Sequence, residues 1–249
     1  MRVALQPAYI LHSRAYRDSS ALLEVFTAEH GRISLVARGA RRKGRGGTPG
    51  ARLQPFTPLL LSFSGRSELK ALGASETVGR PRVLHAQRLF SGMYLNELLM
   101  RLLHRHDPHP RLFACYDATL DALAGIEPVD DVLRQFEFNL LGELGYGFSL
   151  DLDGLSGEAL CPECWYYYHP DWGLVRDDAA RGPSPRAFCG ADLLAMATGG
   201  FGGPARATAK RLLRLVLSMH LGDRPLHSRE LFRSGGAAER GAAGPERAG

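Results

Sequence analysis

Residues 32–47 read RISLVARGARRKGRGG, an alternating apolar segment that runs directly into a series of cations and glycines. The first part is typical of a strand, because Ile33 and Leu35 fall on one side of a chain whose side chains alternate. The second part predicts a loop, since glycine frees the backbone while arginine and lysine carry charges suited to phosphate oxygens. We interpret residues 37–47 as a phosphate-contacting loop, with a solvated tip that contacts nothing as the alternative.

Four further β-rich segments accompany this strand in the first eighty residues. The five segments are Ala8–His12, Leu22–Thr27, Arg32–Ala37, Pro58–Phe63 and Glu68–Ser75. Five short strands punctuated by glycines are typical of a small barrel. We therefore predict a barrel domain in residues 1–80, with the basic loop between its third and fourth strands.

The positive charge of the chain is concentrated in this domain. Residues 1–80 carry 13 Lys or Arg against 5 Asp or Glu, a net charge of +8. Residues 81–249 carry 18 against 21, a net charge of −3. This asymmetry indicates a localised anionic partner rather than a general requirement for solubility. The cations that we predict to contact a nucleic-acid backbone in this domain are Arg14, Arg17, Arg38, Arg41, Arg42, Lys43, Arg45 and Arg52.

Beyond residue 80 the apolar residues take the spacing of helices. Leucines from position 95 to 103 and the segments 112–124 and 132–144 predict a bundle. Asp130 or Asp131 can cap the last of these helices at its start, and Gly145 can end it. We assign residues 81–150 to the first part of a helical domain.

The helical domain resumes in residues 186–234, mainly as a helix over 204–221 with Gly222 just past its end. Three cations of this helix, Lys210, Arg211 and Arg214, are further candidates for nucleic-acid contact. Residues 235–249 contain glycine, alanine and charged residues with almost nothing to bury, so we predict a disordered tail.

Residues 151–185 predict a compact hairpin insert with half of a zinc-site motif. Cys161 and Cys164 have the spacing of two thiolate ligands, but a structural zinc site needs four. His169 and Cys189 are the only further candidates; they stand in no paired spacing, and we expect Cys189 to belong to the later helix. We therefore expect no bound metal and leave the three cysteines as weak candidates. The aromatic row 165–168 fits core packing better than base stacking.

The sequence contains no catalytic signature. Phosphate-binding Gly-Lys-Thr loops, dinucleotide fingerprints and nucleophile elbows are absent from it. Asp151 and Asp153 fit a solvated acidic face better than a magnesium site. We therefore predict a protein that is not an enzyme and requires no cofactor.

The sequence also lacks the segments that direct a protein to a membrane or span one. The opening residues lack the apolar core of a signal peptide, and no stretch approaches the ~18 apolar residues of a membrane helix. We expect a cytoplasmic, nucleoid-associated protein with no membrane partner.

Six phrases in order along the chain resemble the bacterial RecO family of DNA repair and recombination mediators. They are Leu11–Ser20, Phe26–Arg32, Val36–Arg42, Leu53–Pro58, Leu140–Gly147 and Leu221–Phe232. The resemblance implies an α+β multidomain fold, in which an N-terminal five-stranded OB-fold barrel precedes a helical domain with an inserted zinc-finger-like lobe. The chain departs from the family pattern at Arg176, where members with a complete zinc site carry a second cysteine pair.

The resemblance also implies a function and partners. It implies binding of single- and double-stranded DNA, annealing of complementary strands and, with RecR, loading of RecA on DNA coated by single-stranded DNA-binding protein (SSB). Arg134 falls where a family arginine helps to hold the SSB tail; from sequence alone, a plain surface arginine is the alternative. Two other classes stay open: a zinc-dependent nucleic-acid-binding regulator that uses the Cys161 lobe, and an adaptor that binds only proteins.

Overall fold

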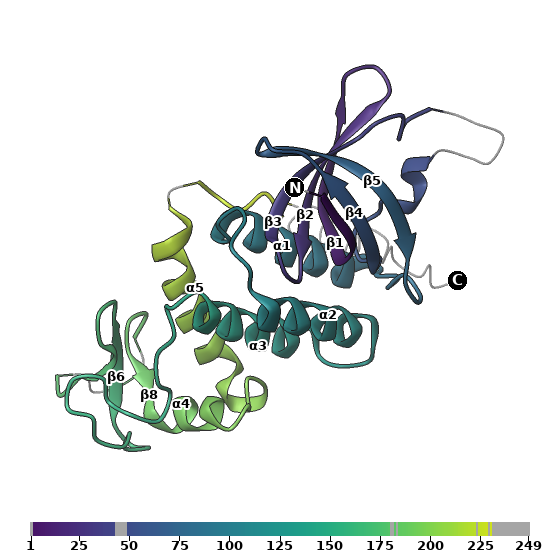
Figure 1. Cartoon of the computed structure of the whole chain (residues 1–249). Coiled ribbons are helices and arrows are strands. Elements are labelled where there is room, and N and C mark those ends of the chain that lie inside the picture. The colour runs from purple at the N-terminus through teal and green to yellow at the C-terminus, as the bar shows by residue number, and fades with distance from the viewer. Residues whose placement is uncertain are drawn as a thin grey trace, which may run out of the picture. The chain divides into compact units, whose positions relative to one another are not determined.

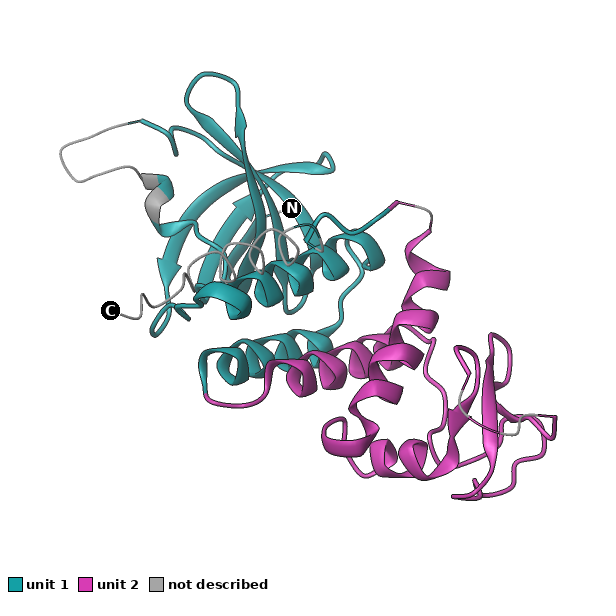
Figure 2. Ribbon diagram, turned by 180° about the vertical axis from the view of Figure 1, so that it is seen from behind, with its two compact units in different colours: residues 1–125, 225–249 teal, residues 126–224 magenta. Residues whose placement is uncertain are grey.

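The computed structural model describes residues 2–42, 49–179, 182, 184–222, 224–228 and 230. Its contacts divide the chain into two compact units, which are coloured separately in Figure 2. The first unit comprises residues 1–125 and the segment from Pro225 onward, and the second comprises residues 126–224. The predicted tail, residues 235–249, lies outside the described residues.

The first unit contains the predicted five-stranded barrel. Its strands are β1 (Arg2–Tyr16), β2 (Ser20–Thr27), β3 (Gly31–Ala37), β4 (Leu59–Ser64) and β5 (Leu69–Thr77). They close in the order β1-β2-β3-β5-β4, and the β3–β5 pair is parallel while the other four pairs are antiparallel. The prediction of an α+β protein with an N-terminal OB-like barrel is confirmed.

Strand β1 is much longer than the predicted segment, and this length gives the barrel a projecting hairpin. Its first part pairs with β4, and its second part pairs only with β2 as far as Tyr16 opposite Ser20. Figure 1 shows this β1–β2 hairpin extending beyond the barrel wall. Sequence reasoning missed the extension past His12 because residues 13–16 read SRAY and show no clear apolar alternation.

The barrel interior is filled by aliphatic side chains from all five strands. Ile33 and Leu35 are fully buried in one cluster, so the predicted common face of this strand is confirmed. Leu23 and Val25 of β2 join them, together with Leu61 of β4. Burying apolar side chains contributes roughly 1.5–3 kcal/mol each. The outer face of the same strands is thus free to carry polar and charged groups.

Two helices, α1 (Ala86–Leu102) and α2 (Pro110–Ala124), complete the first unit. Asn96 of α1 donates a hydrogen bond of 2.9 Å to the Leu11 carbonyl of β1, and it accepts one from Tyr116 of α2. Arg82 ties the same elements together through Asp117 and the Tyr9 hydroxyl. The predicted domain boundary at residue 80 therefore falls inside this unit.

A buried carboxylate fastens the segment after Pro225 to α1. Glu97 accepts hydrogen bonds from the His227 N–H at 3.0 Å and from the Ser228 N–H and hydroxyl at 2.8 and 2.7 Å. Arg101 pairs with Glu97 at 2.8 Å and donates to the Pro225 carbonyl. These contacts explain why the segment belongs to the first unit.

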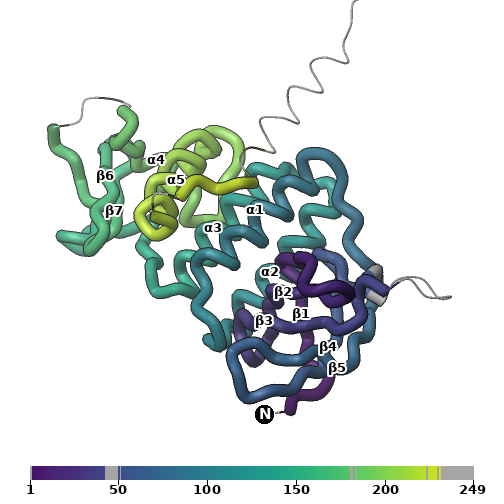
Figure 3. Tube along the Cα trace, turned by 90° about the horizontal axis from the view of Figure 1, so that it is seen from above, coloured from purple at the N-terminus to yellow at the C-terminus, as the bar shows by residue number. Residues whose placement is uncertain are grey.

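The second unit combines helices with a small sheet. Its elements are α3 (Val129–Glu143), β6 (Trp165–His169), β7 (Gly173–Arg176), β8 (Phe188–Cys189), α4 (Gly190–Ala197), the 3-10 helix η2 (Gly203–Ala205) and α5 (Arg206–Leu221). The sheet order is β7-β6-β8, and Figure 3 shows α4 and α5 beside this sheet. Tyr166 is buried, as the core interpretation of the aromatic row expects, and its neighbours in β6 are half-buried.

Two local predictions in this unit were wrong. Helix α3 begins at Val129, so Asp130 and Asp131 lie inside its first turn and do not cap it. Carboxylates in a first turn still favour the helix dipole. Cys189 is the last residue of β8 and does not lie in the following helix, because it pairs with Trp165 of β6. The predicted helix ends at Gly145 and Gly222 are confirmed, each with positive φ.

None of the helices within the described residues has the length and apolarity that a bilayer crossing requires.

Replacing Glu97 by glutamine is expected to destabilise the first unit by about 2 kcal/mol, because buried hydrogen bonds to a charged group are lost. The effect should depend on pH. Burial alone would raise the pKa of Glu97, but the hydrogen bonds from Ser228 and His227 and the charge of Arg101 hold it below its usual value. The stabilisation is therefore complete above the ordinary carboxyl pKa and is lost as the pH falls through the lowered one.

Chemical denaturation between pH 7 and pH 3 would measure this difference. Glu76→Gln is the matched control, since Glu76 is exposed and makes the same change of charge. Equal unfolding free energies for the two variants at pH 7 would contradict the assignment of Glu97 as the fastening group.

Candidate nucleic-acid interface

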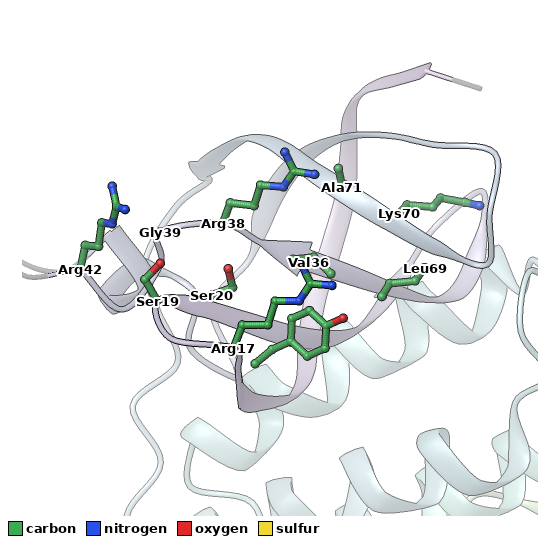
Figure 4. A pocket seen from close by; sticks show the side chains of 11 residues that line it. Arg17, Ser19, Ser20, Val36, Arg38, Gly39, Arg42, Leu69, Lys70 and Ala71 are labelled. Carbon is green, nitrogen blue, oxygen red and sulfur yellow. The ribbon is translucent and has the colours of Figure 1, made fainter.

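A groove of about 600 Å³ lies on the outer face of the barrel. The β1–β2 hairpin contributes Tyr16, Arg17, Ser19 and Ser20, the end of β3 contributes Val36, Arg38, Gly39 and Arg42, and the start of β5 contributes Leu69, Lys70 and Ala71. We call this the barrel groove. Figure 4 shows Arg17 and Arg38 on either side of it, with Arg42 at one end and Lys70 at the other.

Arg17 is held outward by an unusual backbone conformation. It occupies the left-handed region with φ of +52° at the tip of the hairpin, where a residue other than glycine costs about 1 kcal/mol. Its guanidinium carbon lies 5.3 Å from the centroid of the Tyr16 ring. An arginine beside an accessible aromatic ring is the combination that single-strand binding uses for backbone contact and base stacking.

The start of the basic loop is pinned to this hairpin by backbone hydrogen bonds. The Arg41 N–H donates to the Ser19 carbonyl at 3.0 Å, and the Gly50 N–H donates to the Ala40 carbonyl at 2.9 Å. A side chain on Gly50 would approach the Ala40 carbonyl oxygen to 2.7 Å, so only glycine fits there. The loop therefore leaves and returns at one point, beside the barrel groove.

Three of the four cations of the groove are available to a ligand, whereas Lys70 is mostly buried. Arg17, Arg38 and Arg42 are exposed. Across the described part of the chain, the ion pairs formed do not include any of these three. Their mutual repulsion is relieved only by solvent and counterions, which a phosphate backbone can replace.

The other predicted cations of the barrel lie near the groove or outside the described residues. Arg14 and Arg41 line a separate hollow of about 420 Å³. Arg52 is exposed at the end of the 3-10 helix η1 (Pro49–Arg52). Lys43 and Arg45 lie outside the described residues, so their role stays a prediction.

The three candidate cations of α5 have different surroundings. Lys210 pairs with Asp130 at 3.6 Å. Arg211 donates to the Ala187 carbonyl at 2.6 Å and lies 4.9 Å from the centroid of the buried Phe188 ring. Arg214 is exposed. These contacts assign Arg211 a structural role in the second unit, whatever it does with DNA.

Arg134, the predicted receptor of the SSB tail, is buried on α3. Its side chain is 8% exposed and pairs with Glu137 at 2.7 Å, while the Glu137 side chain is fully buried. A ligand carboxylate would therefore have to compete with Glu137 for this guanidinium. Phe138, one turn further along α3, packs on Phe148 and Phe201 and is half-buried.

The three weak metal candidates lie around one turn. The Cys164 N–H donates to the Cys161 carbonyl at 3.1 Å, and the Cys189 thiol donates to the Pro162 carbonyl at 3.6 Å. The Cys161 thiol donates to Glu163. In the portion of the chain that the structure describes, no group of three or more His, Cys, Asp or Glu side chains is arranged to hold a metal ion. These residues do not fit a four-ligand zinc site.

Sequence reasoning missed two cations that the fold brings to this face. Lys70 lines the barrel groove because the parallel β3–β5 pairing brings the start of β5 beside the end of β3, although its side chain is mostly buried. Arg105, after α1, reaches Glu24 of β2 and Glu68 before β5. Lys70 could have been found from a predicted barrel topology, whereas Arg105 lies in a connection with no motif of its own.

Arg211→Ala is expected to lower the free energy of unfolding of the second unit by about 1.5 kcal/mol, because a charge-assisted hydrogen bond and an aromatic contact are lost. Arg214→Ala removes the same charge from the same helix, and its effect should stay within about 0.5 kcal/mol. Urea unfolding followed by circular dichroism would measure both. Equal losses would contradict the structural role of Arg211.

Comparisons with known proteins match nearly the whole chain to a single family. The family models Recombination protein O N terminal and Recombination protein O C terminal match residues 1–80 and 85–230. DNA repair protein RecO of Pseudomonas paraeruginosa is 48% identical over 230 residues, which cover 92% of this chain and 94% of the relative. The protein of the same name from Methylococcus capsulatus is 49% identical over 234 residues, which cover 94% of each. The chain belongs to the RecO family.

Proposed function

We propose that this chain acts in DNA repair and recombination as a non-enzymatic mediator. In this role it binds single- and double-stranded DNA, anneals complementary strands and, with RecR, promotes RecA loading on DNA coated by SSB. Family membership supports the role in repair and recombination. The barrel groove supports the nucleic-acid step, because it gathers three exposed arginines, which form no ion pair among the described residues, beside the half-buried Tyr16.

The observation that carries the proposal is the convergence of Arg17, Arg38 and Arg42 on one groove from two separate segments. Each guanidinium can take a phosphate oxygen and release a condensed counterion, so binding gains entropy and weakens with salt. Tyr16 offers a ring on which any base can stack. The groove therefore favours a backbone without selecting a sequence.

Annealing follows from the same charges. Two DNA strands repel each other through their phosphates, and the barrel domain brings a net charge of +8 to the encounter. Neutralising one strand lowers its repulsion of the second, while base pairing supplies the specificity. This step requires no bond to be made or broken, which is why the proposed activity is non-enzymatic.

Replacing Arg17, Arg38 and Arg42 together by alanine is expected to weaken single-strand binding at least tenfold at low salt. It should also flatten the dependence of log K on log salt by about 2 units, because each phosphate contact contributes about 0.7. Fluorescence anisotropy over a salt series would measure both. Annealing of complementary strands should slow in the same variant.

Arg2, Arg80 and Arg111 form the matched control, since all three are exposed and lie outside the groove. Replacing them by alanine changes the net charge equally. Equal losses of affinity in the two triple variants would contradict a groove and leave only general charge. An adaptor that binds only proteins predicts that the wild-type chain retards no oligonucleotide at low salt.

The SSB tail offers a second test, because Arg134 has a built-in competitor. If Arg134 receives the tail carboxylate, Glu137→Gln should tighten binding of a tail peptide about threefold, and Arg134→Gln should abolish it. If the Arg134–Glu137 pair is purely structural, each variant should lose peptide binding only to the extent that it loses folded protein. Calorimetric titration with the peptide, alongside thermal unfolding of each variant, separates the two outcomes.

A further inference from the structure

A second cationic cluster lies on the barrel beyond the groove. Arg105, in the connection between α1 and α2, forms a backbone bridge with Arg32 of β3, and the His106 N–H donates to the Arg32 carbonyl at 3.0 Å. The Arg105 guanidinium contacts the Ser34 hydroxyl. It also pairs with Glu24 at 3.1 Å and with Glu68 at 3.3 Å. The connection is thereby fastened to the outer face of β3.

This cluster is continuous with the barrel groove. Ser34, Val36 and Arg38 are alternate residues of one strand and its end, so their side chains leave β3 on the same side. Lys70 lines the barrel groove and also a neighbouring hollow of about 520 Å³, to which Arg66 and Glu68 contribute. The distance along β3 from residue 32 to residue 38 is about 20 Å, which is within the span of one OB-fold site.

The two anions of the cluster are not equally firmly held. The Glu24 side chain is 16% exposed and accepts a hydrogen bond of 2.6 Å from Ser34. It also pairs with Arg32 and Arg105. The Glu68 side chain is 68% exposed, and its ion pair with Arg105 joins two exposed loops. Exposed pairs of this kind contribute about 0.2–1 kcal/mol. A phosphate can therefore displace Glu68 far more easily than Glu24.

Displacing Glu68 would leave a net positive charge, because Arg32, Arg66, Lys70 and Arg105 would remain beside two carboxylates, Glu24 and Glu29. Arg66 and Lys70 share the hollow with Glu68, and the Lys70 ammonium, on a side chain that is mostly buried, has the Ser67 carbonyl within 3.1 Å. Burial, together with the charge of Arg105, already lowers the pKa of Arg32. The guanidinium groups are thus crowded, and a phosphate in place of Glu68 would bring a stronger acceptor to them.

From these contacts we propose that the DNA track continues past Lys70 to a second phosphate site formed by Arg105, Arg66 and Lys70. In the free protein, the carboxylate of Glu68 occupies this site as an internal competitor. The inference rests on the proposed function, because it assumes that a single strand enters the barrel groove. It adds a phosphate site that includes Arg105 from the connection between α1 and α2. It also adds an internal competitor, Glu68, that lowers the affinity for DNA.

Glu68→Gln tests the proposal because it removes the competitor and leaves the cations in place. Binding of a single strand of about 16 nucleotides should tighten about threefold at low salt, and the salt dependence should steepen by about 0.7. A strand of about 4 nucleotides, which cannot span both sites, should bind the variant and the wild type alike. Arg105→Ala should weaken only the long strand.

Glu76→Gln is the matched control, since Glu76 is also exposed, lies in β5 and loses the same charge. A threefold gain for Glu68→Gln with a smaller gain for Glu76→Gln supports the second site. Equal gains would overturn it in favour of general charge, and so would a gain that is equal for the long and the short strand. Thermal unfolding of Arg105→Ala separates lost contacts from lost folding.

The proposed function and the second phosphate site are disproved by different results. If the wild-type chain binds no single strand, the proposed function fails, whatever Glu68 does. If the wild type binds and the variant of Arg17, Arg38 and Arg42 is impaired, but Glu68→Gln matches Glu76→Gln, the barrel groove stands and the second site is wrong.

Discussion

Closure of the barrel depends on one parallel pairing, in which Ser34, Leu35 and Val36 of β3 lie opposite Leu69, Lys70 and Ala71 of β5. The two segments are separated by more than thirty residues, so the closure entropy must be offset by the aliphatic core that it encloses. The same pairing brings the end of β3 and the start of β5 side by side. The barrel groove exists only because this closure forms, and its cations come from segments that are otherwise distant.

The charges at the barrel groove disfavour folding. Arg17 adopts a strained backbone at the hairpin tip, and Arg38 and Arg42 face solvent without an ion pair within the described residues. Two largely buried guanidinium groups elsewhere in the described residues are matched by carboxylates. Arg82 holds Asp117, and Arg134 holds Glu137. Unmatched charge at one face, against matched charge in the packed regions, is what a surface designed for an anionic partner requires.

The sequence was sufficient for the elements whose signal is local. The alternation of Ile33 and Leu35 predicted a strand with one buried face, and Gly145 and Gly222 predicted two helix ends. It was insufficient where the outcome depends on tertiary contacts. The polar residues before Arg17 form a strand because β2 pairs with them, and Arg211 is engaged because Phe188 and the Ala187 carbonyl meet it. No local pattern reports such partners.

The central claim is that a DNA strand lies in the barrel groove, and site-specific photocrosslinking tests it most directly. A photoreactive amino acid at Val36, which lines the groove, should crosslink to a bound single strand, and competing unlabelled strand should suppress the product. The same amino acid at Ile126, which is exposed in a connection that carries no candidate cation, should give little crosslinking. Efficient crosslinking from Ile126 with none from Val36 would contradict the account.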